Sequence, residues 1–138
     1  MAFTDPAADL RATIEAKLRA DPALAALIGD RIFDRVPNKP DYPLVTIGNM
    51  QVIPESADGV DAAETAVTIH VWDQFKHADK SRKVGGAVIN ALHDEGLTTA
   101  DSGTQSVLLE SANYIRDPDG VTNHAVLTFS ILTDANAL

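Results

Sequence analysis

Apolar residues near the start of the chain recur at the spacing of a helix. Leu10, Ile14 and Leu18 fall every four residues and therefore line one face of a predicted first helix. A second, shorter helix is predicted from Pro22, which suits a first turn, to Gly29, which suits the left-handed residue after a helix. The chain thus opens with two helices that precede its first strand.

Strict alternation of apolar and polar side chains in the middle of the chain predicts strands instead. In the segment Glu64–Asp73, the side chains of Val67, Ile69 and Val71 point to one side and the residues between them to the other. The final strand, Thr122–Thr133, alternates in the same way. Three further strands are predicted over Arg31–Val36, Tyr42–Ile53 and Gln105–Arg116.

A third helix is predicted over Ala78–His93, where Val84, Val88 and Leu92 form an apolar stripe. The pair Gly85-Gly86 weakens this helix by about 1 kcal/mol per glycine relative to alanine. Two explanations stay open. The glycines let the helix approach another backbone closely, or they are a tolerated cost.

The predicted elements follow one another in the order α, α, β, β, β, α, β, β. Consecutive strands pair through hairpins and one helix crosses over, which is typical of an α+β fold rather than of a doubly wound parallel sheet. We therefore expect a mostly antiparallel sheet packed against two main helices. The chain has 138 residues and no segment typical of a linker, so a single domain over residues 1–138 is expected.

The amino-acid composition excludes several kinds of functional site. The chain has no cysteine, which excludes disulfides, thiolate zinc sites and iron–sulfur clusters and makes a reducing cytoplasm the expected compartment. No run approaches the ~18 apolar residues of a membrane span. Twenty acidic residues against eleven basic ones give a net charge of −9, so we expect the chain to repel DNA rather than bind it.

No motif for catalysis or for cofactor binding is present. The sequence lacks a Gly-x-Ser-x-Gly elbow and a phosphate-binding loop. The run His93-Asp94-Glu95 lacks the second histidine of a zinc-binding helix and is interpreted as a helix end, where the dipole favours histidine. The run Asp117-Pro118-Asp119-Gly120 lacks the later acids of a calcium loop and is interpreted as a hairpin turn. We expect no catalytic, metal or cofactor-binding residue and no enzyme.

Three ring side chains, His70, Trp72 and His124, fall on the less apolar faces of their strands. Adjacent strands would bring the two histidines together, yet two imidazoles without a third ligand make a poor metal site. We favour two partly exposed histidines on a polar or subunit-facing sheet surface. Trp72 is either covered by a helix or used in a subunit contact.

Several segments follow a fixed order over most of the chain, from about Leu10 to Thr133. They are Asp21–Phe33, Val36-Pro37, Tyr42–Gly48, Val67–Asp73, Ile89–His93 and Ser111–Gly120. In this order and spacing the sequence resembles the tail terminators, the small tail-completion proteins of long-tailed phages and gene transfer agents. The segment Pro54–Ala63 matches no motif of that family.

The resemblance implies a structural virion protein rather than a catalyst. Tail terminators form a ring, commonly of six subunits, that caps the head-proximal end of the tail tube, stops tube polymerisation and joins the tail to the head connector. The expected partners are other copies of the chain, the tail tube protein and the head-side connector or stopper, while DNA passes through the lumen without specific binding. No cofactor and no membrane is implied. The expected location is the host cytoplasm during assembly and then the tail neck of the particle.

A closed ring needs two different surfaces that meet between neighbouring copies. An acidic loop and a basic segment are the candidates, and the loop Pro54–Ala63 is also expected to contact the tail tube. The acidic candidates are Glu55, Asp58, Asp61 and Glu64. The basic candidates are Lys76, Lys80, Arg82 and Lys83. Trp72 is a further interface candidate.

Two alternatives stay open at the level of the sequence. A head–tail connector or stopper protein shares the size and the ring habit of a terminator. A small non-viral binding module would recognise a ligand or partner as a monomer or dimer.

Overall fold

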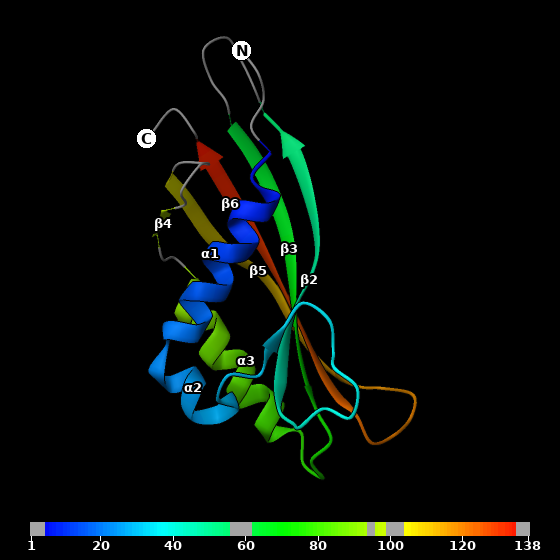
Figure 1. Cartoon of the computed structure of the whole chain (residues 1–138). Helices are drawn as coiled ribbons and strands as arrows, with labels where there is room; N and C mark the ends of the chain where they lie inside the picture. The colour runs from blue at the N-terminus through cyan, green and yellow to red at the C-terminus, as the bar shows by residue number, and fades with distance from the viewer. Residues whose placement is uncertain (1–4, 56–61, 94–95, 99–103, 135–138) are drawn as a thin grey trace.

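A computed structural model describes residues 5–55, 62–93, 96–98 and 104–134 (Figure 1). The helices are α1 (Ala7–Ala20), α2 (Pro22–Ile28) and α3 (Asp79–Leu92). The strands are β1 (Ile32–Phe33), β2 (Leu44–Pro54), β3 (Ala62–Asp73), β4 (Gly96–Thr98), β5 (Thr104–Arg116) and β6 (Asn123–Asp134). The predicted α+β fold, with its mostly antiparallel sheet and two main helices, is confirmed.

The six strands form one sheet in the order β1-β2-β3-β6-β5-β4. The four long strands occupy its middle, and every neighbouring pair is antiparallel except β1 with β2. The register of β3 with β6 runs unbroken from Ala62 opposite Asp134 to Asp73 opposite Asn123. This central pair sets which side chains share a face.

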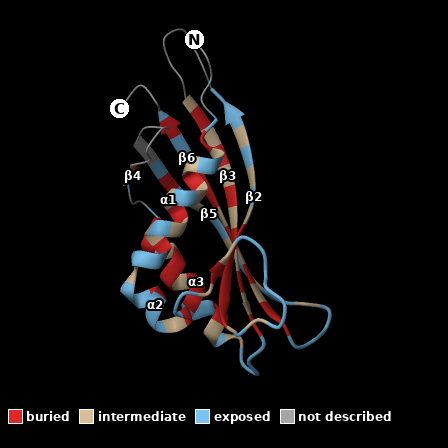
Figure 2. Cartoon of the chain, viewed as in Figure 1, coloured by how far each residue is buried: buried red, intermediate tan, exposed pale blue. Residues whose placement is uncertain are grey.

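All three helices cover the same face of the sheet, and the core lies between them and the strands (Figures 1 and 2). The alternation of β3 is confirmed, because Val67, Ile69 and Val71 are fully buried on this side. On β6, Leu127 and Phe129 are buried beside them. Among the described residues no helix covers the opposite face, which we call the open face. It presents the less buried half of each strand, on which polar residues alternate with the exposed hydrophobic side chains of Ile53, Leu108, Ile115 and Leu132.

The first two helices form as their sequence predicts. Leu10, Ile14 and Leu18 of α1 are fully buried, and burying each such side chain stabilises the fold by roughly 1.5–3 kcal/mol. Asp21 caps α2 by accepting a hydrogen bond from the backbone N–H of Leu24 at 2.9 Å. The two helices are thus separated by a residue that ends one and starts the next.

The two glycines of α3 differ in their surroundings. A Cβ atom added at Gly85 would lie 2.6 Å from the Tyr114 hydroxyl oxygen, whereas one added at Gly86 would meet nothing within 4 Å. Gly85 therefore permits a close approach, to a ring of β5 rather than to a backbone. Gly86 has no such role, and its lower helix propensity is a tolerated cost.

Two elements differ from the sequence-based expectation. The strand predicted over Arg31–Val36 is only the two-residue β1, and it runs parallel to β2 because residues 34–43 carry the chain back before β2 begins. β4 was not predicted. It has three residues, too few for a periodic pattern, and buries Leu97 against the core.

Candidate assembly surfaces

Three rings form a stacked cluster on the open face. The predicted meeting of the two histidines takes place: His70 Nδ1 and His124 Nε2 are 2.7 Å apart. The Trp72 ring stacks on His124, with ring centroids 3.7 Å apart and planes at 12°. The Trp72 indole N–H donates a hydrogen bond to Thr46 Oγ1 at 3.1 Å, so β2, β3 and β6 all hold the cluster in place.

The charge state of the two histidines follows from their neighbours. Burial lowers the pKa of His70 below 6.5, and the nearby charge of His124 lowers it further. Burial also lowers the pKa of His124, although Asp117, whose Oδ1 lies 3.5 Å from His124 Nδ1, opposes this change. With both rings neutral, His124 directs its Nδ1–H at Asp117 and accepts a hydrogen bond from His70 through Nε2. In this arrangement the hydrogen bonds run from His70 through His124 to Asp117, the acceptor in the β5–β6 turn.

Gly48 makes room for this chain, and sequence reasoning missed it. A Cβ atom added there would lie 2.9 Å from His70 Nε2 and 2.9 Å from the carbonyl oxygen of Thr68. The register of β2 with β3 shifts at this point, between Ile47 and Met50. A glycine inside a predicted strand is the signal that marks such a site.

The cluster is a hydrogen-bonded group rather than a set of metal ligands. The two facing ring nitrogens are at hydrogen-bond distance, whereas zinc holds each nitrogen at about 2.0–2.1 Å and needs more room between two of them. Within the described ranges, no three histidine, aspartate or glutamate side chains could hold a metal ion together.

Trp72 lies against a shallow cavity instead of beneath a helix. The cavity has a volume of about 250 Å³ and is also lined by Val36, Tyr42, Asp117 and Thr122. Of the two explanations offered for Trp72, coverage by one of the described helices is excluded, since α1, α2 and α3 all lie on the other face of the sheet. The use of this side chain in a subunit contact stays a prediction.

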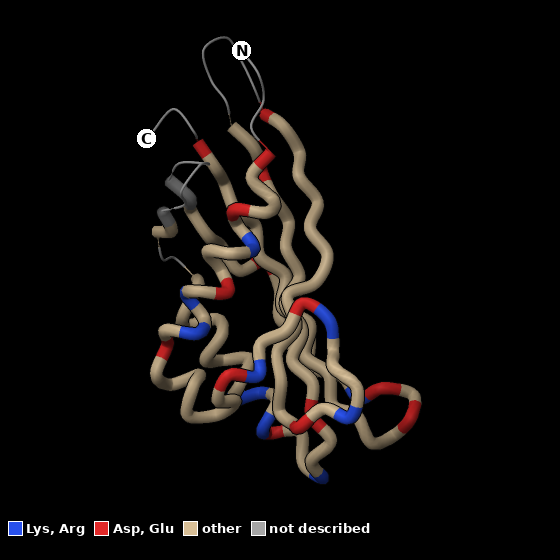
Figure 3. The backbone as a smooth tube through the Cα atoms, in the orientation of Figure 1, with Lys and Arg blue, Asp and Glu red and all other residues tan. Residues whose placement is uncertain are grey.

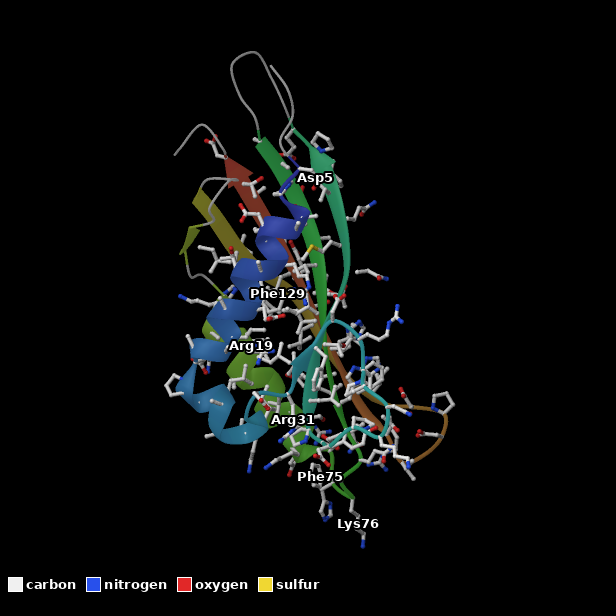
Figure 4. The ribbon with its side chains drawn as sticks, in the orientation of Figure 1. Asp5, Arg19, Arg31, Phe75, Lys76 and Phe129 are labelled. Atoms are coloured by element: carbon white, nitrogen blue, oxygen red, sulfur yellow. The ribbon has the colours of Figure 1, made fainter. Side chains whose placement is uncertain are left out.

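The basic segment lies at the end of the sheet where β3 leads into α3. Lys76, Arg82 and Lys83 are exposed and Lys80 is half-buried. Arg82 donates a hydrogen bond to Asp79 at 2.9 Å. Phe75, which is 45% exposed, stands beside Lys76 at this end (Figure 4).

Arg116 joins this end of the molecule from β5, and sequence reasoning missed it. Its Nε donates to Asn123 Oδ1 at 3.3 Å, and its Nη2 lies 3.5 Å from the carbonyl oxygen of Lys76. It lines two cavities, of about 210 and 240 Å³, one beside Arg82 and one beside Phe75. No local motif marks it, because its partners lie on other elements.

A fully buried carboxylate fixes the loop that carries Phe75. Asp73 Oδ1 accepts hydrogen bonds from Asn123 Nδ2 at 2.6 Å and from the backbone N–H of Phe75 at 3.0 Å. Asn123 also donates to the carbonyl oxygen of Phe75 at 2.9 Å. The start of β6 and the end of β3 together hold this loop.

Two of the acidic candidates, Glu55 and Glu64, lie toward the opposite end of the sheet. Glu55 is exposed after β2, and Glu64 accepts a hydrogen bond from Ser130 Oγ at 3.1 Å. Asp58 and Asp61, and most of the loop predicted to contact the tail tube, lie outside the described residues. The length of β3, roughly 40 Å, separates this end from Lys76 (Figure 3). Among the described residues, Glu55 and Glu64 therefore do not meet the basic segment within one copy of the chain.

These features define a class of protein. A small α+β protein presents an open sheet face, with Glu55 and Glu64 near one end of the sheet and the basic segment at the other. None of the described helices is long and apolar enough to span a membrane.

The family follows from comparison with known proteins. The family model described as Tail completion protein gp17 matches residues 12–134, and the chain belongs to this family. It is a family of structural virion proteins and not of enzymes. The chain is also similar to a solved chain in the "Virion of native gene transfer agent (GTA) particle", with 25% sequence identity and a TM-score of 0.87 over 93% of this chain and 96% of that one. Among curated proteins no relative matches the sequence.

Proposed function

We propose that the protein is a tail terminator of a phage or gene transfer agent. Copies of it form a closed ring, of six in the form we favour, that caps the head-proximal end of the tail tube and stops its growth. The observation that carries the proposal is the likeness to a chain of a gene transfer agent virion, which covers nearly all of both chains.

The geometry supports a ring through the separation of its charged ends. A closed ring joins two different patches, one on each neighbour. The acidic group around Glu55 and Glu64 and the basic group around Lys76 and Lys83 cannot neutralise each other within one copy, so they are available to a neighbour or to the tube and the head-side connector. The net charge of −9 suits a lumen through which DNA passes without being held. Assembly takes place in the host cytoplasm, and the finished ring sits in the tail neck.

Negative-stain microscopy of the purified protein, alone and mixed with tail tubes, tests the proposal. Rings seated on tube ends are the expected result. Rings that bind portal assemblies but not tubes would assign the protein to the stopper or connector position instead. Small particles without ring structure in every mixture would overturn the proposal.

A further inference from the structure

At each edge of the sheet, about half of a long strand has no neighbouring strand in the part of the chain that the structure describes. The two unpaired, or open, halves belong to β2 and β5. β1 pairs only with Val45 and Thr46, so the described residues leave β2 without a partner on that side from Gly48 to Pro54. β4 pairs only with residues 104–106 of β5. Beyond Leu109, whose N–H donates to His93 Nδ1, the described chain offers no partner to the outer edge of β5 from Ser111 to Arg116.

Apart from the register shift at which each open half begins, these edges carry little of the usual protection against pairing. Exposed edge strands normally carry lysine, inward-pointing charges, proline or β-bulges, which keep other strands away. The open part of β2 has no charged residue, and its one proline, Pro54, is its last residue. The open part of β5 has a single charge, Arg116, also at its end. Each offers about six residues, the common length of a strand.

The direction of the two strands allows them to pair with each other between copies. β2 is antiparallel to β3, β3 to β6 and β6 to β5, so β2 and β5 run in opposite directions. A second copy placed beside β2 therefore presents its β5 as an antiparallel neighbour. We propose that the open half of β2 in one copy pairs with the open half of β5 in the next, so that the sheet continues from copy to copy around the ring; this inference rests on the proposed function.

The faces of the sheet fix the register. On the helix-covered side, Met50 and Val52 are half-buried on β2, and Ala112 and Tyr114 are half-buried on β5. Placing Gln51 opposite Asn113 sets Met50 against Tyr114 and Val52 against Ala112. Apolar side chains then continue the core across the junction, and two amide side chains face each other on the open face.

The offset between copies agrees with a closed sheet. Within one copy Gln51 is level with Leu108, through Ala66 and Ser130, but across the junction it meets Asn113. The step from Leu108 to Asn113 crosses the register shift between Leu109 and Ser111, so each copy is displaced by about four residue rises, or roughly 13 Å, for four strands that span about 19 Å. This ratio corresponds to a strand tilt of about 35°, at the lower end of the range of about 35–45° found in closed barrels. β1 and β4 end the open halves and act as stops for the register.

A disulfide between copies tests the pairing, because the chain has no cysteine of its own. Gln51 and Asn113 are both exposed, and directly opposed Cα atoms lie about 4.5–5.5 Å apart, within disulfide range. The double variant Gln51→Cys/Asn113→Cys is assembled with tail tubes, oxidised with diamide and run on a non-reducing gel. We expect a ladder of covalent species up to the full ring, and loss of the ladder on reduction.

The matched control is Gln51→Cys/Asn90→Cys, whose second thiol stands on an exposed position of α3. Each single variant is run beside it, and none of these should form species larger than a dimer. Rings of normal appearance that give no ladder would overturn the edge pairing and leave the proposed function standing. A ladder from the control as strong as that of the test pair would also overturn it. Failure of the wild-type chain to form rings with tubes would overturn the proposed function and this inference together.

Discussion

The two neighbouring glycines of α3 differ in how an added Cβ atom would affect the stability of the fold. At Gly85 an added Cβ would press on the Tyr114 ring, so Gly85→Ala should lower the free energy of unfolding by about 1–2 kcal/mol, the cost of modest overpacking. At Gly86 the added Cβ meets open space, so Gly86→Ala should raise the free energy of unfolding by up to about 1 kcal/mol, because alanine has the higher helix propensity. Urea unfolding of the two variants gives the comparison. Equal effects would show that the Tyr114 ring moves aside without cost.

The paired histidines make stability depend on pH. Because the pKa values of His70 and His124 are lowered below 6.5 in the folded chain, the unfolded chain binds more protons just below that pH. The free energy of unfolding should be greatest above pH 6.5 and fall as the pH drops through it. Asp117, the charged group that faces His124, makes the fall smaller than burial alone would.

Urea midpoints at pH 5.5 and pH 7.5 check this expectation. The double variant His70→Gln/His124→Gln keeps polar side chains on the open face and should show a smaller difference between the two midpoints. A wild-type midpoint that does not change between these pH values would contradict the assignment of neutral rings.

Residues whose role depends on local pattern could be predicted, and those whose role depends on distant partners could not. The alternation of Val67, Ile69 and Val71 gave their burial, and the same alternation placed His70 on the face of His124. The signals of Asp73 and Arg116 are absent from their own segments, because the partners of each lie on another element. The spacing of residues thus predicts which face of a helix or strand a side chain lies on. Contacts between side chains of different elements can be identified only once the fold is known.

At the scale of elements, the loop between β3 and α3 depends on one buried group. Asp73→Ala would leave the backbone N–H of Phe75 and one of the two N–H groups of the Asn123 amide without their acceptor, and it should lower the free energy of unfolding by about 3 kcal/mol. The exposed Asp41 offers a control, since Asp41→Ala should stay within about 0.5 kcal/mol. Urea unfolding measures both, and hydrogen exchange of the Phe75 amide reports whether the loop opens. An unchanged exchange rate would mean that other contacts hold the loop.

Short elements were the hardest to foresee. Two residues of β1 and three of β4 carry too few side chains for a period to emerge, and neighbouring strands impose their pairing. The longer helices and strands agree with expectation to within a few residues, since ten or more positions repeat one pattern.

At the scale of the whole molecule, charge should govern how copies meet. We expect Lys80→Glu/Lys83→Glu to slow ring formation several-fold, with a larger effect at low salt, because exposed charges act mainly on association rate. The control Arg35→Glu/Lys39→Glu changes the net charge equally in the loop before β2. Light scattering during assembly gives the rates. If the two variants slow assembly equally, the net charge of the chain controls the assembly rate, and the basic segment makes no specific contribution to it.

Net charge also predicts how the isolated chain treats DNA. With a charge of −9, no binding to a duplex is expected at about 150 mM salt in a gel-shift assay. A retarded band under these conditions would contradict the proposed passage of DNA without specific binding.

The separation of acidic and basic groups along β3 makes each copy an electric dipole. In a ring of copies related by rotation, the dipole components perpendicular to the axis cancel and those along it add. With strands tilted about 35° from the axis, roughly four fifths of each dipole remains in the sum. The two rims of such a ring differ in electrostatic potential, the rim near Glu55 and Glu64 being the more negative. The proposed ring is therefore electrostatically polar along its axis. A tube end that binds one rim more strongly than the other would fix the orientation of the whole ring on the tube.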